Sequence, residues 1–307
     1  SHLLMSEENQ HVQIDKCQDE TTKLEKQFLQ NYNITIEQAQ SAEEGQIINK
    51  CLILQQQNYP EKAFARRADF QFVLALNLIK ISKGMFHKAK CLKSVFMPKL
   101  ENFDQTDFQQ DEIVGGFTKT NIASVCMPNL TSVQDFGFEN SKLTTVDLPK
   151  LLQVKSFGFS RSQIASLTAP KLKFVEQSGF EQCAKLVCVE LPGLEEISGA
   201  GFAFCENLEH FSAPKLKKIG RNCFSLCKSL VSLECNLAAA DFVCTEGSCI
   251  AGKRCPACKG EVEACLKRGK AKGMGNLLGG VARVQEELLK GLKDDKNHRG
   301  HDSAADQ

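Results

Sequence analysis

Apolar residues recur with a fixed phase through the middle of the chain, mostly in units of 21 or 22 residues. Each unit starts at a proline, has leucine two positions later, an aliphatic or aromatic residue at the fifth position and phenylalanine at the tenth. The prolines are Pro98, Pro128, Pro149, Pro170, Pro192 and Pro214, and the phenylalanines are Phe108, Phe138, Phe159, Phe180, Phe202 and Phe224. Because one such unit cannot enclose its own apolar side chains, the spacing predicts a solenoid in which neighbouring units share one core.

Alternating apolar and polar residues precede each proline, as in residues 143–148 and 186–191. Alternation with a period of two predicts a half-buried strand, and one strand per unit at constant phase stacks into a parallel sheet. Proline then ends the strand, because it has no N–H to give to the ladder. We expect the rest of each unit to return along a mostly irregular far face, with the phenylalanines stacked inside.

Two places depart from the regular unit. The unit that begins at Pro98 holds about eight extra residues, which we place after Phe108 as a loop that bulges from the far side. This loop runs over residues 109–120 and contains Gly115 and Gly116. Earlier in the chain, residues 47–71 have only a weak form of the pattern, with Phe64 near the aromatic position, and are interpreted as a degenerate first unit.

Three units carry the run Phe-x-x-Cys-x-x-Leu, at residues 180–186, 202–208 and 224–230. Together with the Val-x-Leu-Pro run that follows the first of them, this resembles the BspA-like branch of the leucine-rich repeat superfamily, over about residues 72–236. The resemblance implies an α/β-type repeat solenoid. It also implies that the outward side chains of the sheet read a protein partner.

The outward side chains of the expected sheet are therefore the candidate binding residues. They comprise Phe96, Cys126, Asp147, Thr168, Cys188, Glu190, His210, Ser212 and Glu234. Phe96 and Cys126 are the apolar members, so we expect them to be exposed and to contribute most to binding.

The composition divides the chain into four parts. Residues 1–46 are interpreted as a tag remnant followed by a helical N-terminal cap, in which Thr35 and Gln38 have the spacing of a capping box. Residues 47–236 form the solenoid, and residues 237–268 a cysteine-rich C-terminal cap. Residues 269–307 hold a basic linker, an amphipathic helix and a polar tail that we expect to be disordered.

The cysteines after the repeats form a cluster of their own: Cys244, Cys249, Cys255, Cys258 and Cys265. The Cys255-x-x-Cys258 spacing resembles the knuckle of a zinc ribbon, in which two thiolates hold one metal ion. The spacing of Cys244 and Cys249 does not fit that pattern, so a cap with free thiols or a disulfide stays open beside a zinc site. Cys183, Cys205 and Cys227 occupy one interior phase, which favours reduced thiols and a reducing compartment.

Apolar residues from Leu277 to Leu292 recur at helical spacing. This helix could bind a partner helix, pair with a second copy of the chain, or pack on its own domain.

Charge and composition narrow the function. The net charge is +1 and the chain has no tryptophan, which argues against a nucleic-acid binder, and no apolar run is long enough to span a membrane. Cys188 and His210 share a strand phase, but no third residue stands by to orient them. We therefore expect a cytoplasmic, non-catalytic protein-binding scaffold. A secreted or surface adhesion protein with oxidised C-terminal cysteines, and a substrate-reading subunit linked to a zinc module, are the alternatives.

Overall fold

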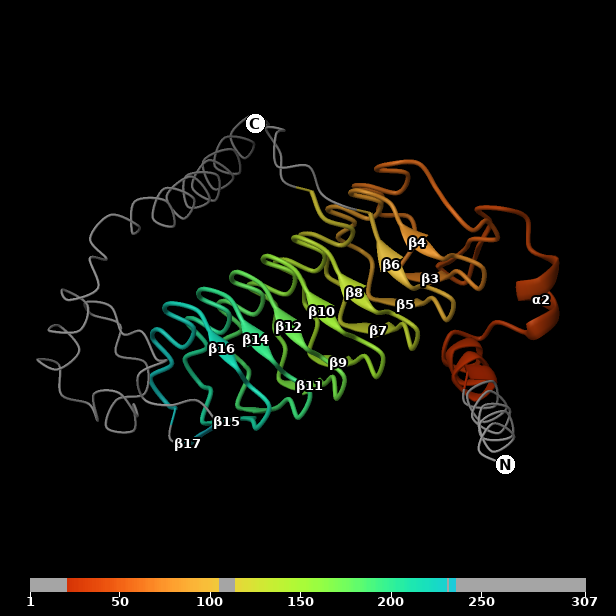
Figure 1. The fold of residues 1–307 in the computed structure, drawn as a ribbon. Helices are drawn as coiled ribbons and strands as arrows, with labels where there is room; N and C mark the ends of the chain where they lie inside the picture. Colours follow the sequence, from red (N-terminus) through yellow and green to blue (C-terminus); the bar gives the residue numbers. More distant parts are fainter. Residues whose placement is uncertain (1–20, 105–113, 231, 236–307) are drawn as a thin grey trace, which may run out of the picture.

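The computed structural model describes residues 21–104, 114–230 and 232–235. In this part the chain winds into a stack of similar turns, a β-solenoid with little helix (Figure 1). The turns carry two rows of parallel strands. The expectation of one strand per unit and a mostly irregular return was wrong in this respect, because the return path of each turn contains a second, shorter strand.

The first row consists of the strands that the alternating pattern predicts. They are β2 (Cys51–Ile53), β3 (Phe72–Leu74), β5 (Ser94–Phe96), β7 (Ser124–Cys126), β9 (Thr145–Asp147), β11 (Ser166–Thr168), β13 (Cys188–Glu190), β15 (His210–Ala213) and β17 (Ser232–Cys235). Within three groups, β2–β3–β5–β7, β9–β11 and β13–β15–β17, neighbouring strands pair in parallel with equivalent residues opposite one another. A short strand β1 (Ile47–Ile48) pairs antiparallel with β2. The middle residue of each strand points into the core, so the residues before and after it face outward.

The second row lies on the return path. It consists of β4 (Lys80–Ile81), β6 (Asn102–Phe103), β8 (Ser132–Val133), β10 (Gln153–Val154), β12 (Phe174–Val175), β14 (Glu196–Ile197) and β16 (Lys218–Ile219). In each strand the second residue is the buried fifth-position residue of the unit, and the first residue faces outward. Burial of that one side chain holds the dipeptide extended, so neighbouring dipeptides pair in parallel from β8 to β16 and between β4 and β6.

A column of phenylalanine rings runs through the core between the two rows. The rings of Phe86, Phe117, Phe138, Phe159, Phe180, Phe202 and Phe224 are stacked nearly parallel, with centroids 5.0–5.9 Å apart. Phe117, and not Phe108, fills the place in the Pro98 unit, so the extra residues precede the aromatic position. The backbone hydrogen bonds between turns hold Phe117 at this position, because its N–H donates to Gly137 O of the next turn at 2.8 Å. Phe108 and residues 109–113 of the expected loop lie outside the described residues.

Next to the stacked phenylalanines, the backbone changes direction through residues whose φ is positive, in the left-handed region of conformational space. Around Phe138, for example, these are Phe136 with φ 57° and Asn140 with φ 52°. Their N–H groups donate to Ser156 O and Ser160 O of the next turn at 3.0 and 2.9 Å. Such backbone is uncommon for residues other than glycine, and here it keeps the ladder of hydrogen bonds continuous through the corner.

An N-terminal segment, defined here as residues 21–41, precedes the solenoid. Residues 21–31 are helical, and a second helix, α2 (Ile36–Ser41), begins at the predicted capping box: Thr35 Oγ1 accepts from Gln38 N, and Gln38 Oε1 accepts from Thr35 N. The segment packs on the outward side of β2, β3 and β5, where the exposed positions are apolar. The C-terminal parts, residues 237–268 and 269–307, lie outside the described residues.

Candidate ligand-binding surface

The outward side of the first row of strands has two parts of different character. Over β2, β3, β5 and β7 it is apolar and is largely covered by the N-terminal segment, whose buried side chains are Phe28, Leu29, Ile34 and Ala39. Two ring contacts hold the segment there. Tyr32 stacks on Phe72 with centroids 3.7 Å apart, and Phe28 lies 5.4 Å from Phe96.

Phe96 was expected to be an exposed contact residue, and that expectation was wrong. Its side chain is 1% exposed, because the N-terminal segment occupies the surface that Phe96 would offer. Cys126, the other apolar candidate, is half-buried at the edge of the same cluster. Burial, and to a lesser degree the charge of Asp147, raises the pKa of the Cys126 thiol to about 11.

The second part is polar and free of the segment. We call it the open face; it consists of the outward side chains of β9, β11, β13, β15 and β17. The remaining seven candidate residues lie on it, all exposed except the half-buried Ser212: Asp147, Thr168, Cys188, Glu190, His210, Ser212 and Glu234.

The open face has two columns, set by the strand register. Asp147 lies opposite Thr168, and further along Glu190 lies opposite Ser212, which lies opposite Glu234. This column therefore alternates carboxylate and hydroxyl. The other column is uncharged except for one imidazole and contains Thr145, Ser166, Cys188, His210 and Ser232. No lysine or arginine stands in either of these columns.

Cys188 and His210 are opposite each other in the register, as the sequence predicts. The described structure contains no hydrogen bond between the thiol and the imidazole. A nucleophilic thiolate needs such a base within hydrogen-bonding reach, so this pair lacks the geometry of a catalytic dyad.

The interior cysteines form the predicted column. The thiols of Cys183, Cys205 and Cys227 donate to the carbonyl oxygens of the ring residues one turn back, Phe159, Phe180 and Phe202, at 3.2, 3.2 and 3.1 Å. Burial raises the pKa of Cys183 and of Cys227 to about 12. Because the thiolate is the reactive form, these three side chains act as small core residues.

The proposed metal ligands cannot be placed. Cys244, Cys249, Cys255, Cys258 and Cys265 lie outside the described residues, as does the segment from Leu277 to Leu292 that the sequence predicts to be helical. Within the described part of the chain, no three metal-ligating side chains come together. The helices in that part are all too short or too polar to cross a lipid bilayer.

The two strand rows, the ring column and the open face define a repeat protein of the leucine-rich repeat class. Residues 115–231 match the family described as BspA type leucine rich repeat region, in six copies, and over these residues the chain belongs to that family. The predicted family is thereby confirmed.

Two solved structures are similar to this chain. A leucine-rich repeat protein from Bacteroides ovatus is 20% identical, with a TM-score of 0.33 over 55% of this chain and 56% of that protein. A leucine rich cell surface protein from Faecalibacterium prausnitzii is 16% identical, with a TM-score of 0.30 over 59% of this chain and 64% of that protein. This chain thus spans less than two thirds of either protein. No curated protein sequence matches it.

Proposed function

We propose that the protein is a non-catalytic binding protein and that its open face holds an extended, basic segment of a protein partner. The carboxylate and hydroxyl column carries this proposal. Its three carboxylates, Asp147, Glu190 and Glu234, are exposed and stand on every second strand.

The spacing of the column sets the geometry of the partner. Adjacent strands lie about 4.8 Å apart, so carboxylates on every second strand are roughly 10 Å apart. An extended peptide rises about 3.3 Å per residue, so every third side chain matches that interval. A partner segment with lysine or arginine at every third position, laid across the strands, would pair with all three carboxylates. The hydroxyl groups of Thr168 and Ser212, which stand between them, can hydrogen-bond its backbone or polar side chains.

The lysines at the edge of the open face add a second requirement. Lys150 and Lys171 are exposed one residue beyond the prolines that end β9 and β11, and Lys215 follows Pro214. A partner that is basic over the column and acidic toward this edge has complementary charge at both places.

A direct test uses two synthetic peptides of the same composition, one with lysine at every third position and one with its lysines adjacent. Binding is measured by fluorescence anisotropy at low ionic strength. Exposed ion pairs each contribute about 0.2–1 kcal/mol, so the substitutions Asp147→Asn, Glu190→Gln and Glu234→Gln together should weaken binding of the spaced peptide roughly tenfold.

The matched control carries Glu61→Gln, Glu101→Gln and Glu206→Gln, which change the total charge equally but lie outside the open face. Equal weakening in both triple variants would leave only a non-specific charge effect and would overturn the assignment of the open face. Equal affinity for the two peptides would contradict binding of the partner in an extended conformation.

The cellular location divides this proposal into two versions, a cytoplasmic scaffold and a surface or secreted adhesion protein. The similar protein from Faecalibacterium prausnitzii is named a cell surface protein. For this chain, the cysteines offer the test. Intact mass with and without alkylation, on protein isolated from its native source, counts the disulfides: oxidised C-terminal cysteines support the surface version, and fifteen free thiols support the cytoplasmic one.

A further inference from the structure

The second row of strands carries a surface feature that the repeat does not require. Its outward positions are polar in every described strand but one: Lys80, Asn102, Ser132, Gln153, Glu196 and Lys218. The exception is Phe174 on β12, whose side chain is 41% exposed. Phe174 has no role in the shared core. A single exposed apolar side chain is common on protein surfaces, so the significance of Phe174 rests on the groups that surround it.

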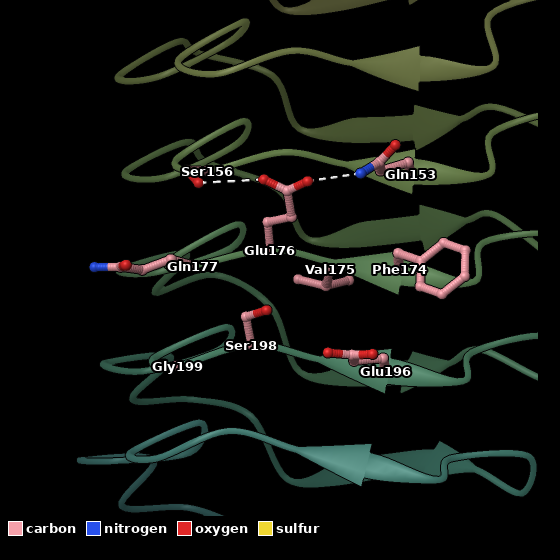
Figure 2. Close-up of a pocket in the computed structure, with 9 residues that line it drawn as sticks. All are labelled: Gln153, Ser156, Phe174, Val175, Glu176, Gln177, Glu196, Ser198 and Gly199. Atoms are coloured by element: carbon pink, nitrogen blue, oxygen red, sulfur yellow. Dashed lines mark hydrogen bonds between the residues drawn. The ribbon is translucent and has the colours of Figure 1, made fainter. Parts of the chain in front are cut away.

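Phe174 borders a hollow of about 440 Å³ in this surface (Figure 2). The hollow exists because the next turn places small residues, Ser198 and Gly199, where the turn of Phe174 has Glu176 and Gln177. Phe174 and Glu196 stand on one side of it, on neighbouring strands, and Glu176 stands on another.

The charge of the hollow is negative. Glu176 and Glu196 are the charged residues that line it. Glu196 forms an ion pair with Lys218, and Glu195 just outside is paired with Lys173 and Lys217. The Glu176 carboxylate instead accepts hydrogen bonds from two neutral donors, Gln153 Nε2 at 2.6 Å and Ser156 Oγ at 3.4 Å. In the described part of the chain no cation pairs with it.

An exposed aromatic ring on one side of a hollow and such a carboxylate on another fit one kind of chemical group. A planar guanidinium stacks on an aromatic face and donates a fork of hydrogen bonds to a carboxylate, which a neutral or anionic group cannot do. We propose that this hollow binds an arginine side chain of a protein partner, with the guanidinium over Phe174 and hydrogen-bonded to Glu176. This second binding surface is independent of the open face, from which it differs in strand row, residues and shape.

The test compares two heptapeptides in a glycine and serine background, one with a central arginine and one with citrulline, its uncharged isostere. Binding to the full chain is followed by backbone amide chemical shifts. The arginine peptide should shift Val175, Glu176, Ser198 and Gly199, and the citrulline peptide should bind about tenfold more weakly. Equal shifts from the two peptides, or shifts confined to other surfaces, would overturn the proposal.

Two variants assign the binding to the named groups. Phe174→Ala and Glu176→Gln should each weaken arginine binding several-fold, and both change exposed or half-exposed side chains, so the fold should persist. Leu226→Ala, at an equally exposed apolar residue outside the hollow, is the matched control. If the control weakens binding as much as Phe174→Ala, the hollow is not the site. The triple variant of the open face should bind the arginine peptide unchanged, which separates this proposal from the proposed function.

Discussion

At the scale of single residues, the ring column connects successive turns of the solenoid. Each ring touches the ring above and the ring below at about the same distance, so each is shared by two interfaces between turns. Loss of one ring therefore leaves a cavity that weakens both interfaces at once.

Phe159→Ala should lower the free energy of unfolding by roughly 3–5 kcal/mol, the usual cost of removing a buried phenylalanine. Its side chain is fully buried between Phe138 and Phe180. Urea denaturation followed by circular dichroism measures the loss. Phe174→Ala, which removes an exposed ring, should cost much less, and a similar cost in both variants would contradict the role given to the column.

Glu139 is the second residue whose behaviour can be predicted. It is buried, and burial raises its pKa, although the nearby charges of Arg161, 3.8 Å away, and Lys119 act in the opposite direction. A carboxyl with a raised pKa in the folded state holds its proton there more tightly than in the unfolded chain. It therefore contributes stability below its ordinary pKa, and this contribution is lost as the pH rises through the folded value.

Glu139→Gln removes that titration. The free energy of unfolding of the wild type minus that of the variant should fall as the pH is raised from 4 toward 7, measured by urea denaturation at several pH values. A difference that grows over this range would mean that the ion pair with Arg161 outweighs burial. Glu206→Gln, at an exposed ion-paired carboxylate, is the control.

At the scale of elements, the N-terminal segment and the first three strands depend on each other. Phe72, Leu74 and Phe96 face outward and need an apolar cover, and the segment supplies it through side-chain contacts. The backbone–backbone hydrogen bonds of residues 21–41 stay within the segment, whereas each turn of the solenoid is joined to the next by several. Two side chains of the solenoid also donate to carbonyl oxygens of the segment, Asn49 Nδ2 to Asn33 O at 2.7 Å and Gln55 Nε2 to Ala39 O at 3.3 Å. The segment should therefore open at a lower free energy than the turns do.

Phe28→Ala should release the segment, because it removes a buried ring that contacts Phe96. The half-buried Cys126 at the edge of this cluster should then react with iodoacetamide roughly tenfold faster, measured peptide by peptide by mass spectrometry. Cys188 on the open face serves as an internal reference, because its exposure does not depend on the segment. An unchanged rate at Cys126 would show that the segment does not control access to this part of the sheet.

How far the sequence predicts these elements depends on how many residues the pattern of each element contains. The first row of strands follows from its alternation, and the interior place of Cys183 follows from its phase. The second row does not, because a polar residue followed by one aliphatic residue is too short a pattern to identify a strand. Phe108 and Phe117 both follow Pro98 and Phe103, so the sequence pattern does not show which of them joins the ring column. The backbone hydrogen bonds between turns show that it is Phe117. The burial of Phe96 had a signal that was overlooked: Phe72, Leu74 and Phe96 are three apolar residues at outward positions on successive strands, which indicates a cover.

At the scale of the whole molecule, each turn contacts only its neighbours, and stability is close to a sum over turns and interfaces. A charge buried in a central turn should therefore uncouple the two ends without unfolding both. Val154→Asp, at a fully buried position of β10, should split one unfolding transition into two, seen by hydrogen exchange of residues 51–130 and 190–230 at increasing urea concentration. Loss of exchange protection in both regions at the same urea concentration would contradict this view.

The position of the N-terminal segment also has a consequence for biosynthesis. Successive turns join residues that are close in sequence, so each can add to the last as the chain leaves the ribosome. The segment is made first, yet the surface that it covers includes Phe96 and reaches Cys126. Its helices must therefore wait, with Phe28 and Tyr32 unburied, until three further strands have been translated. During that interval a chaperone or a second nascent chain can reach the same apolar strip, which makes synthesis the stage at which this protein is most exposed to mispairing.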